Sequence, residues 1–130
     1  FHCRNIILIS YLIALSSFLV FPVAPPKMMS VYIQDAGAVF ESVEVNRVFI
    51  KGFYNSYAAM PSLHFTWTLL FGLVFFRVNH ILFKCFGLIY PTLTFIAIIV
   101  TGNHFILDSL AGAFVILLSI VLYRTISHGR

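Results

Sequence analysis

Residues 57–64 read Tyr-Ala-Ala-Met-Pro-Ser-Leu-His, and this stretch decides how the rest of the chain is interpreted. A polar, proline-containing loop passes here into an apolar run, which predicts a helix with His64 in its first turn. Pro61 suits the first position of that helix, where its missing N–H needs no partner. The free backbone N–H groups of the turn, together with Ser62, form a natural site for an anion beside His64.

A second passage from loop to helix follows at residues 101–108, Thr-Gly-Asn-His-Phe-Ile-Leu-Asp. His104 and Asp108 are spaced i and i+4, so they are expected to share one helical face. The carboxylate could then accept the Nδ1–H of the imidazole, which fixes the tautomer and leaves Nε2 as a nucleophile or base. An ionisable pair at the head of a membrane helix is costly unless it serves a function.

The composition is that of an integral membrane protein. The 130 residues are 61% hydrophobic and only 9% charged, with a mean hydropathy of +1.01, which excludes an ordinary soluble domain. The length allows one all-α membrane domain, residues 1–130, with about four transmembrane helices of roughly 20 residues each. Because the first residue is Phe1 rather than Met, we expect the domain to be incomplete at its N-terminus.

Four apolar runs are the expected spans: residues 6–21, 63–78, 81–100 and 105–123. A signal peptide is the competing interpretation of the first run, since a basic flank and a short apolar core are typical of one. Pro22, Pro25 and Pro26 end this run without a clear cleavage site, and further spans follow, which favours a membrane helix. The segment 28–60 is expected to be an ordered surface loop that covers the site.

The basic residues predict the topology. If the four helices alternate in direction, one side of the membrane carries Arg4, Arg77, Lys84, Arg124 and Arg130. This side is predicted to be cytoplasmic, since short cytoplasmic loops are rich in Lys and Arg. Both histidine motifs then open on the extracytoplasmic or lumenal face. His64 and His104 are far apart in sequence, but the chain between them crosses the membrane and returns.

The sequence gives little support for a nucleic-acid partner, a disulfide framework or a metal site. The net charge of +4 comes from residues scattered along the membrane flanks, so no nucleic-acid partner is expected. Cys3 and Cys85 are too few and too distant for a metal knuckle or a disulfide framework. A metal site formed by His64, His104 and Asp108 stays open as an alternative.

Together these motifs resemble the type 2 phosphatidic acid phosphatase superfamily, in particular the branch of inositol phosphorylceramide synthases and related inositol phosphotransferases. The resemblance covers residues 22–112. It rests on Ala-Pro-Pro-Lys-Met at 24–28, the stretch 57–64, Gly-Asn-His at 102–104, Asp108, and Ala-Gly at 111–112. These segments stand in the family's order.

The resemblance implies a fold and a mechanism. The family fold has six helices, and the four runs here correspond to the last four. His104 would attack phosphorus to give a phosphohistidine, Asp108 would orient it, and His64 would protonate the leaving alkoxide. The family uses no metal, and no cofactor is expected. The predicted phosphate-binding residues are Lys27, Ser62 and Asn103.

One position departs from the family pattern. Members with the standard third motif have an arginine six residues before the nucleophilic histidine, and this chain has Ile98 there. The charge stabilisation expected of that arginine must therefore come from Lys27, Asn103, Arg47, Lys51 or backbone N–H groups, or be absent. Such stabilisation can change a rate by orders of magnitude.

The sequence thus predicts a lipid-phosphate phosphatase or phosphotransferase of the membrane, whose substrate is a phosphorylated lipid. Water and an alcohol both stay open as acceptors. The alternative is a non-catalytic membrane protein that binds or moves a phosphorylated lipid.

Overall fold

The computed structural model describes residues 3–26 and 58–128, and this part of the chain consists of four α-helices. They are α1 (Cys3–Val20), α5 (Leu63–Phe76), α6 (Ile81–Val100) and α7 (Ile106–His128). The predicted all-α fold is confirmed. Lys27, Arg47, Lys51 and most of the predicted surface loop lie outside the described residues.

Three of these helices, α1, α6 and α7, are long and apolar enough to cross a membrane. The fourth, α5, has 14 residues and is therefore about 21 Å long, shorter than a hydrocarbon core of about 30 Å. Large apolar side chains point outward, among them Leu19 with 78% and Val100 with 77% of their surface exposed. Lipid tails can cover such a surface, so the protein is a membrane protein by the character of its helices.

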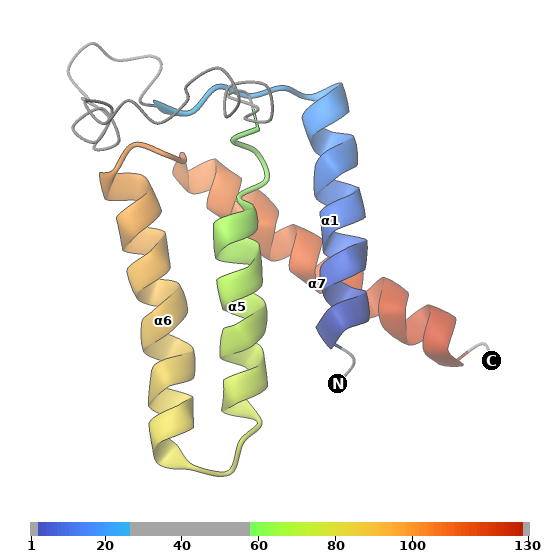
Figure 1. Ribbon diagram of the computed structural model, residues 1–130, viewed down its shortest axis with the longest axis vertical. Helices are drawn as coiled ribbons and strands as arrows, with labels where there is room; N and C mark the ends of the chain where they lie inside the picture. The colour runs from blue at the N-terminus through green and yellow to red at the C-terminus, as the bar shows by residue number, and fades with distance from the viewer. Residues whose placement is uncertain (1–2, 27–57, 129–130) are drawn as a thin grey trace, which may run out of the picture.

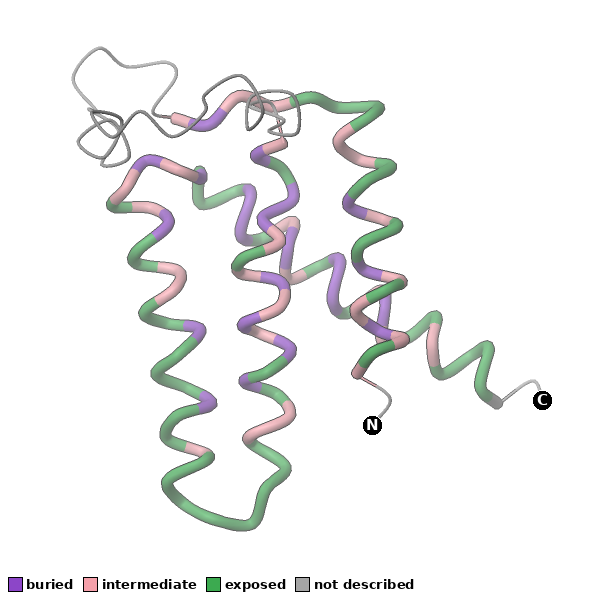
Figure 2. The backbone as a smooth tube through the Cα atoms, in the orientation of Figure 1, coloured by how far each residue is buried: buried purple, intermediate pink, exposed green. Residues whose placement is uncertain are grey.

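The interior, in contrast, is rich in small hydroxyl side chains. Ser10 in α1, Thr66 in α5 and Ser119 in α7 are fully buried. Small and hydroxyl residues let membrane helices approach closely, because lipid tails compete with large apolar side chains but not with this packing. Figure 2 shows buried residues on the inward sides of α5 and α7, whereas the turn that joins α5 to α6 is exposed.

The helices are arranged around α5. Figure 1 shows α5 and α6 as a hairpin, with α1 at the other side of α5 and α7 running obliquely behind. A small apolar cluster joins three of the helices through Ile6, Leu70 and Ile116. The end of α1, the start of α5, the end of α6 and the start of α7 all lie at one end of the bundle. We call this the motif end, because it carries both histidine motifs.

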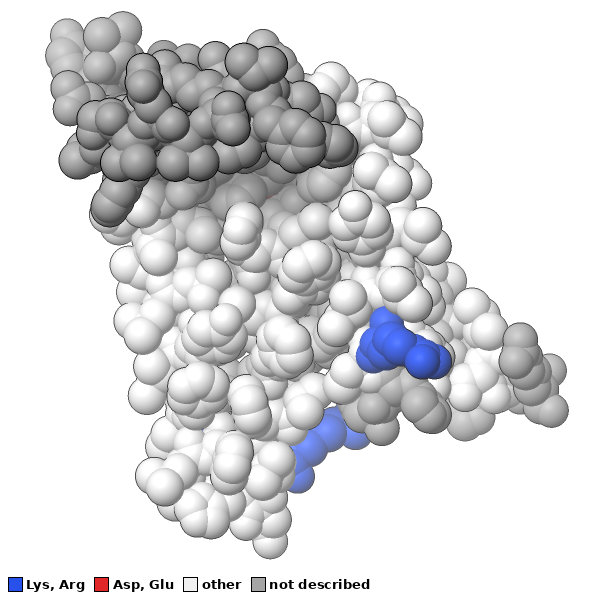
Figure 3. Space-filling view, in the orientation of Figure 1, with Lys and Arg blue, Asp and Glu red and all other residues white. Residues whose placement is uncertain are grey.

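Basic side chains lie toward the opposite end. On the face shown in Figure 3, Lys and Arg side chains are confined to that part of the molecule. The described basic residues stand at the start of α1, at the end of α5, in the first turn of α6 and in the last turns of α7: Arg4, Arg77, Lys84 and Arg124. The predicted separation of these residues from the motifs is confirmed. The assignment of their side to the cytoplasm stays a prediction.

Candidate active site

The first motif begins where the chain returns from the segment after α1. Val23 and Ala58 form an isolated parallel bridge, and the Ala59 N–H donates to the Val23 carbonyl at 3.1 Å. The Met60–Pro61 peptide bond is cis. The bridge between Val23 and Ala58 ties the first motif to the segment that follows α1.

Helix α5 begins at Leu63, with Ser62 as its N-cap. The Ser62 hydroxyl accepts a hydrogen bond from the backbone N–H of Phe65 at 3.4 Å, as N-cap serines commonly do. Pro61 therefore precedes the cap, and its predicted place as first helical residue is wrong. The reason is that the serine oxygen can satisfy a free N–H, whereas proline offers no acceptor side chain. Ser62 is fully buried, and its role as a phosphate ligand stays a prediction.

The second motif is a tight turn between α6 and α7. Gly102 has φ 67°, a left-handed conformation that glycine adopts without strain. The N–H groups of Asn103 and His104 both donate to the Ile98 carbonyl at 3.1 Å. The Asn103 amide donates to the Thr101 hydroxyl at 2.8 Å. Asn103 thus supports the turn that presents His104, and its predicted phosphate contact stays a prediction.

His104 lies before α7, not within it. The helix begins at Ile106, so the expectation that His104 and Asp108 share a helical face is wrong. The Nδ1–H of His104 donates to the carbonyl of Ala59 at 2.8 Å. Since a carbonyl oxygen only accepts, the proton of the neutral ring resides on Nδ1, and Nε2 keeps its lone pair.

Asp108 lies next to His104 and also contacts the backbone at the start of α7; its role in orienting the imidazole stays a prediction. Its Oδ2 lies 3.4 Å from Nδ1 of His104, a longer contact than the 2.8 Å hydrogen bond from Nδ1 to the Ala59 carbonyl. The same oxygen accepts the Phe105 N–H at 2.8 Å. Asp108 therefore caps the start of α7 and places a negative charge near His104, whereas the main hydrogen bond to the imidazole comes from Ala59.

The start of α7 is also joined directly to the start of α5. The Ser62 N–H donates to the Asp108 carbonyl at 3.0 Å. A Cβ atom built on Gly112 would lie 2.8 Å from the Ser62 carbonyl oxygen and 2.7 Å from the Thr66 hydroxyl. The absence of a side chain at Gly112 thus lets α7 pack against the first turn of α5.

The two histidines meet at the motif end. His64, in the first turn of α5, is exposed, and His104 retains 7% of its surface. Their ring centroids are 5.9 Å apart, with the planes tilted by 57°. The predicted proximity of the two rings is therefore present in the fold.

Burial sets the protonation of His104. It lowers the pKa of the imidazole below the ordinary value of 6.5, and the nearby His64 acts in the same direction. The Ala59 carbonyl and the Asp108 carboxylate raise it, but they do not outweigh burial. The ring is therefore neutral at pH 7, with Nε2 available as a nucleophile or base.

A comparison with known families identifies the class. A family model, described as the PAP2 superfamily, matches residues 2–122. The chain belongs to the PAP2 superfamily. No curated protein and no solved structure matches the chain. Membership in the PAP2 superfamily indicates phosphoester chemistry of the phosphatase type in a membrane protein.

Ile98 stands where the family pattern has an arginine. Ile98 is buried in the last turns of α6, and its carbonyl holds the turn before His104. Among the residues that the structure describes, no three His, Cys, Asp or Glu side chains form a group that could hold a metal ion. Lys27, the predicted phosphate-binding cation of this PAP2 chain, lies outside the described residues.

Sequence reasoning missed the Ala59 carbonyl and the contact that Gly112 makes with the start of α5. The Ala59 carbonyl gives no signal in the sequence, because any residue would offer the same oxygen. Gly112 does stand out as a glycine inside an apolar helix, which often marks a close approach, but the partner could not be read from the sequence.

Proposed function

We propose that the protein is a membrane enzyme that cleaves a phosphoester of a lipid through a covalent phosphohistidine on His104. The site faces the extracytoplasmic or lumenal side. Its acceptor is either water or, as in the inositol phosphotransferase branch that the motifs resemble, an alcohol.

The observation that carries this proposal is the arrangement of the two rings. The Nδ1 of His104 is bound to Ala59 at 2.8 Å, so the free Nε2 is the only ring nitrogen that can attack. His64 lies next to it, with 5.9 Å between ring centroids. At this separation one tetrahedral phosphoryl group can contact both imidazoles, given hydrogen bonds of about 3 Å.

The first half of the reaction forms the adduct. Nε2 of His104 attacks phosphorus with its lone pair, the P–N bond forms, and the P–O bond to the leaving group breaks. Protonated His64 gives its proton to the departing alkoxide, which leaves as an alcohol. The Ala59 carbonyl and the Asp108 carboxylate stabilise the positive charge that His104 acquires.

The second half releases the phosphoryl group. Neutral His64 takes a proton from water or from an acceptor alcohol, whose oxygen attacks phosphorus. The P–N bond breaks and its electron pair returns to Nε2. With water the product is a phosphate monoester or inorganic phosphate; with an alcohol it is a new phosphoester. His64 ends protonated, ready for the next turnover.

The negative charge of the phosphoryl group requires compensation. The N-terminus of α5 offers the backbone N–H groups of its first turn and the positive end of the helix dipole, both beside His64. We assign the remaining compensation to Lys27 and Asn103, in place of the family arginine whose position Ile98 occupies.

The test is detection of the adduct with a lipid phosphate labelled at phosphorus. Wild-type protein quenched during turnover should carry an acid-labile label on a peptide containing His104. His104→Asn keeps a donor for the Ala59 carbonyl but removes the nucleophile, so label and turnover should both be lost. His80→Asn, at the exposed N-cap of α6, is the matched control, since asparagine also caps helices. If the His104→Asn protein were still labelled, the nucleophile would be another residue.

Metal independence belongs to the proposal and has its own test. Turnover should persist after exhaustive chelation, and adding back divalent ions should not raise it. If chelation abolished turnover and divalent ions restored it, metal-assisted hydrolysis would be the better mechanism and the phosphohistidine would be rejected.

The orientation can be tested separately. A cysteine in place of Ser56, next to the first motif in sequence, should react with a membrane-impermeant thiol reagent added outside intact cells. The matched site is Cys85, near the start of α6, which should stay protected. Reaction at Cys85 alone would place the motif end in the cytoplasm.

A non-catalytic lipid-binding protein is the second candidate, and the buried Ile98 at the arginine position is the observation that favours it. The same labelling experiment separates the two candidates. Saturable binding of a lipid phosphate without any adduct on His104 would support the non-catalytic protein.

A further inference from the structure

The turn between α6 and α7 uses its backbone donors to close on α6. Four consecutive backbone N–H groups, from residue 101 to residue 104, donate to the last carbonyls of α6 at 3.0 or 3.1 Å. The next one, of Phe105, donates to the Asp108 carboxylate at 2.8 Å. These N–H groups are therefore already bonded, and a donor that the turn offers to a phosphoryl group beside His104 must come from a side chain.

The Thr101 hydroxyl makes two hydrogen bonds in this turn. Its oxygen lies 2.7 Å from the Ala97 carbonyl oxygen and 2.8 Å from the side-chain nitrogen of Asn103. A carbonyl oxygen only accepts, so the single hydroxyl proton lies between Thr101 and Ala97. The hydroxyl must then accept the second bond. Asn103 therefore turns its NH2 group, and not its oxygen, toward Thr101.

The bond to Thr101 leaves one N–H of the Asn103 amide for another partner. No residue that the structure describes accepts this second N–H. Because the amide group is planar, the bond that holds the first N–H also restricts the direction of the second. Asn103 directly precedes His104 and is half-buried at the motif end. The second N–H is thus the remaining side-chain donor between Thr101 and His104.

We propose that Thr101 is a positioning residue, which holds the Asn103 amide so that its second N–H donates to the phosphoryl group transferred to His104. The inference rests on the proposed function for the place of that group. It limits what this turn contributes, in place of the family arginine, to one neutral N–H. A donor that is oriented before the substrate binds stabilises developing charge without reorganisation during the reaction.

Binding of orthovanadate tests the contact without turnover, because this anion takes the five-coordinate geometry of a phosphoryl group in transfer. The full chain is measured in lipid nanodiscs. Thr101→Val replaces the hydroxyl by a methyl group and should weaken binding by about three- to tenfold, as expected for one hydrogen bond. Thr101→Ser keeps the hydroxyl and should restore the binding. If Thr101→Ser bound as weakly as Thr101→Val, the hydroxyl would not be the positioning group.

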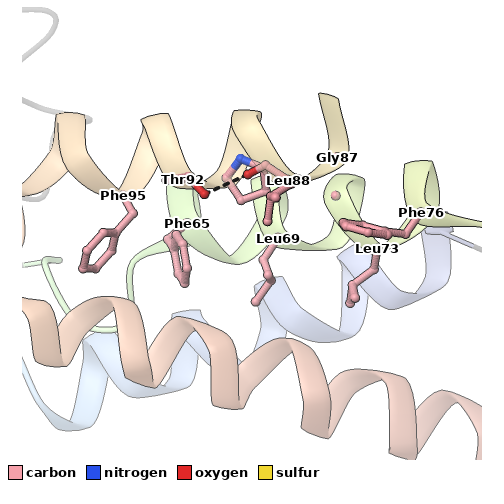
Figure 4. A pocket seen from close by; sticks show the side chains of 10 residues that line it. Phe65, Leu69, Leu73, Phe76, Gly87, Leu88, Thr92 and Phe95 are labelled. Carbon is pink, nitrogen blue, oxygen red and sulfur yellow. Dashed lines mark hydrogen bonds between the residues drawn. The ribbon is translucent and has the colours of Figure 1, made fainter. Parts of the chain in front are cut away.

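The matched control is Thr92→Val in the same helix. Figure 4 shows the hydroxyl of Thr92 bound to the Leu88 carbonyl, at 2.8 Å. This variant loses the same kind of bond that Thr101 makes to Ala97, four residues back in the helix, but it leaves the Asn103 amide held. Orthovanadate binding should therefore be unchanged. Equal losses in the two valine variants would overturn the proposal.

Two changes at Asn103 separate a contact with the phosphoryl group from a role in holding the turn. Asn103→Ala and Asn103→Asp both lose the bond to Thr101, so a role confined to the turn predicts equal losses of binding. A contact with the phosphoryl group predicts a much larger loss for Asn103→Asp, because a carboxylate would then face the anion. Equal binding by the two variants would overturn the proposal.

A double variant tests whether Thr101 acts through Asn103. For turnover of a lipid phosphate, Asn103→Ala should lower kcat by about a hundredfold, as loss of one donor to developing charge does. Thr101→Val alone should lower kcat less, because the N–H is still present but no longer held. The double variant should be no slower than Asn103→Ala. A further loss in the double variant would show that Thr101 acts independently, which contradicts the proposal.

The outcomes separate this inference from the proposed enzyme. Orthovanadate binding that depends on Thr101 and Asn103, without turnover of any lipid phosphate, would retain the anion contact and reject the enzyme. Turnover by the wild type, with orthovanadate binding that neither Thr101→Val nor Asn103→Ala changes, would retain the enzyme and reject the contact. Wild-type protein that binds no orthovanadate would also overturn the contact.

Discussion

Helix α5 has two close contacts of opposite character. On the side of α7, the Ser62 carbonyl and the Thr66 hydroxyl lie against Gly112. The Ser62 N–H also donates to the Asp108 carbonyl at 3.0 Å. Toward α6 the helix meets Gly87 with Gly72, surrounded by apolar side chains. Both crossings depend on glycine, but only the first includes hydrogen bonds to the residues beside His104.

The difference between the two contacts of α5 indicates that they have different roles. The polar contact fixes the position of the second motif relative to the first, and errors there change the geometry of the site. The apolar contact holds the hairpin of α5 and α6 together. Substitutions at the two contacts should therefore affect different measurements.

The largest effect is expected from Gly112→Ala. Its Cβ would lie 2.8 Å from a backbone oxygen, so α7 must shift away from α5 and carry Asp108 with it. A shift of about 1 Å can cost about a hundredfold in rate. The matched change is Gly72→Ala, whose Cβ would lie 2.5 Å from the Gly87 carbonyl oxygen but which stands about 12 Å along the helix from His64. We expect it to lower the thermal stability while reducing the rate with a short-chain substrate much less. The reverse pattern would contradict the division of tasks.

A smaller loss is expected from Asp108→Asn. In a triad whose carboxylate holds the imidazole, this change costs about ten-thousandfold. Here the Ala59 carbonyl supplies the short hydrogen bond, and the asparagine oxygen can still cap Phe105. We therefore expect kcat to fall by only about tenfold, measured with the adduct assay alongside to show that His104 is still labelled. A loss near that of a triad aspartate would make the 3.4 Å contact with Asp108 the dominant one.

The pH dependence of kcat/KM tests the direction in which the surroundings shift the pKa of His104. Because burial lowers the pKa of His104, the acidic limb of kcat/KM should lie below the ordinary histidine value of about 6.5. Asp108 raises this pKa, so Asp108→Asn should move the limb to still lower pH. A purely structural role of Asp108 would leave the limb in place, and a move to higher pH would contradict the assignment.

The smallest effect is expected at the contact of α5 with α1. The Trp67 indole donates to the Ser10 hydroxyl at 3.3 Å, and hydrogen bonds between membrane helices average about 0.6 kcal/mol. Trp67→Phe should lower the free energy of unfolding by about this amount without changing the rate. Ser10→Ala is the partner control, and the double variant should show no additional loss if the two groups interact only with each other.

Several features followed from the sequence because they depend on local patterns or on alternation across a membrane. Apolar runs of sufficient length predicted the helices, although α7 extends five residues beyond the predicted end at Tyr123. Alternation of the spans placed His64 and His104 at one end of the bundle. The spacing of the motifs then indicated the superfamily that the family model matches. Each of these inferences needs only the identity of residues and the thickness of a bilayer.

Other features were decided by tertiary structure alone. The partner of Nδ1 is a backbone carbonyl, which every residue possesses, so no sequence pattern could select Ala59. Helix α5 begins at Leu63 rather than at the predicted Pro61, because the Ser62 hydroxyl caps the helix there. The close approach of α5 and α6 is possible because Gly72 and Gly87, fifteen positions apart in sequence, face each other across the hairpin. Contacts of this kind depend on the relative rotation and tilt of helices, which apolar periodicity in a lipid environment does not determine.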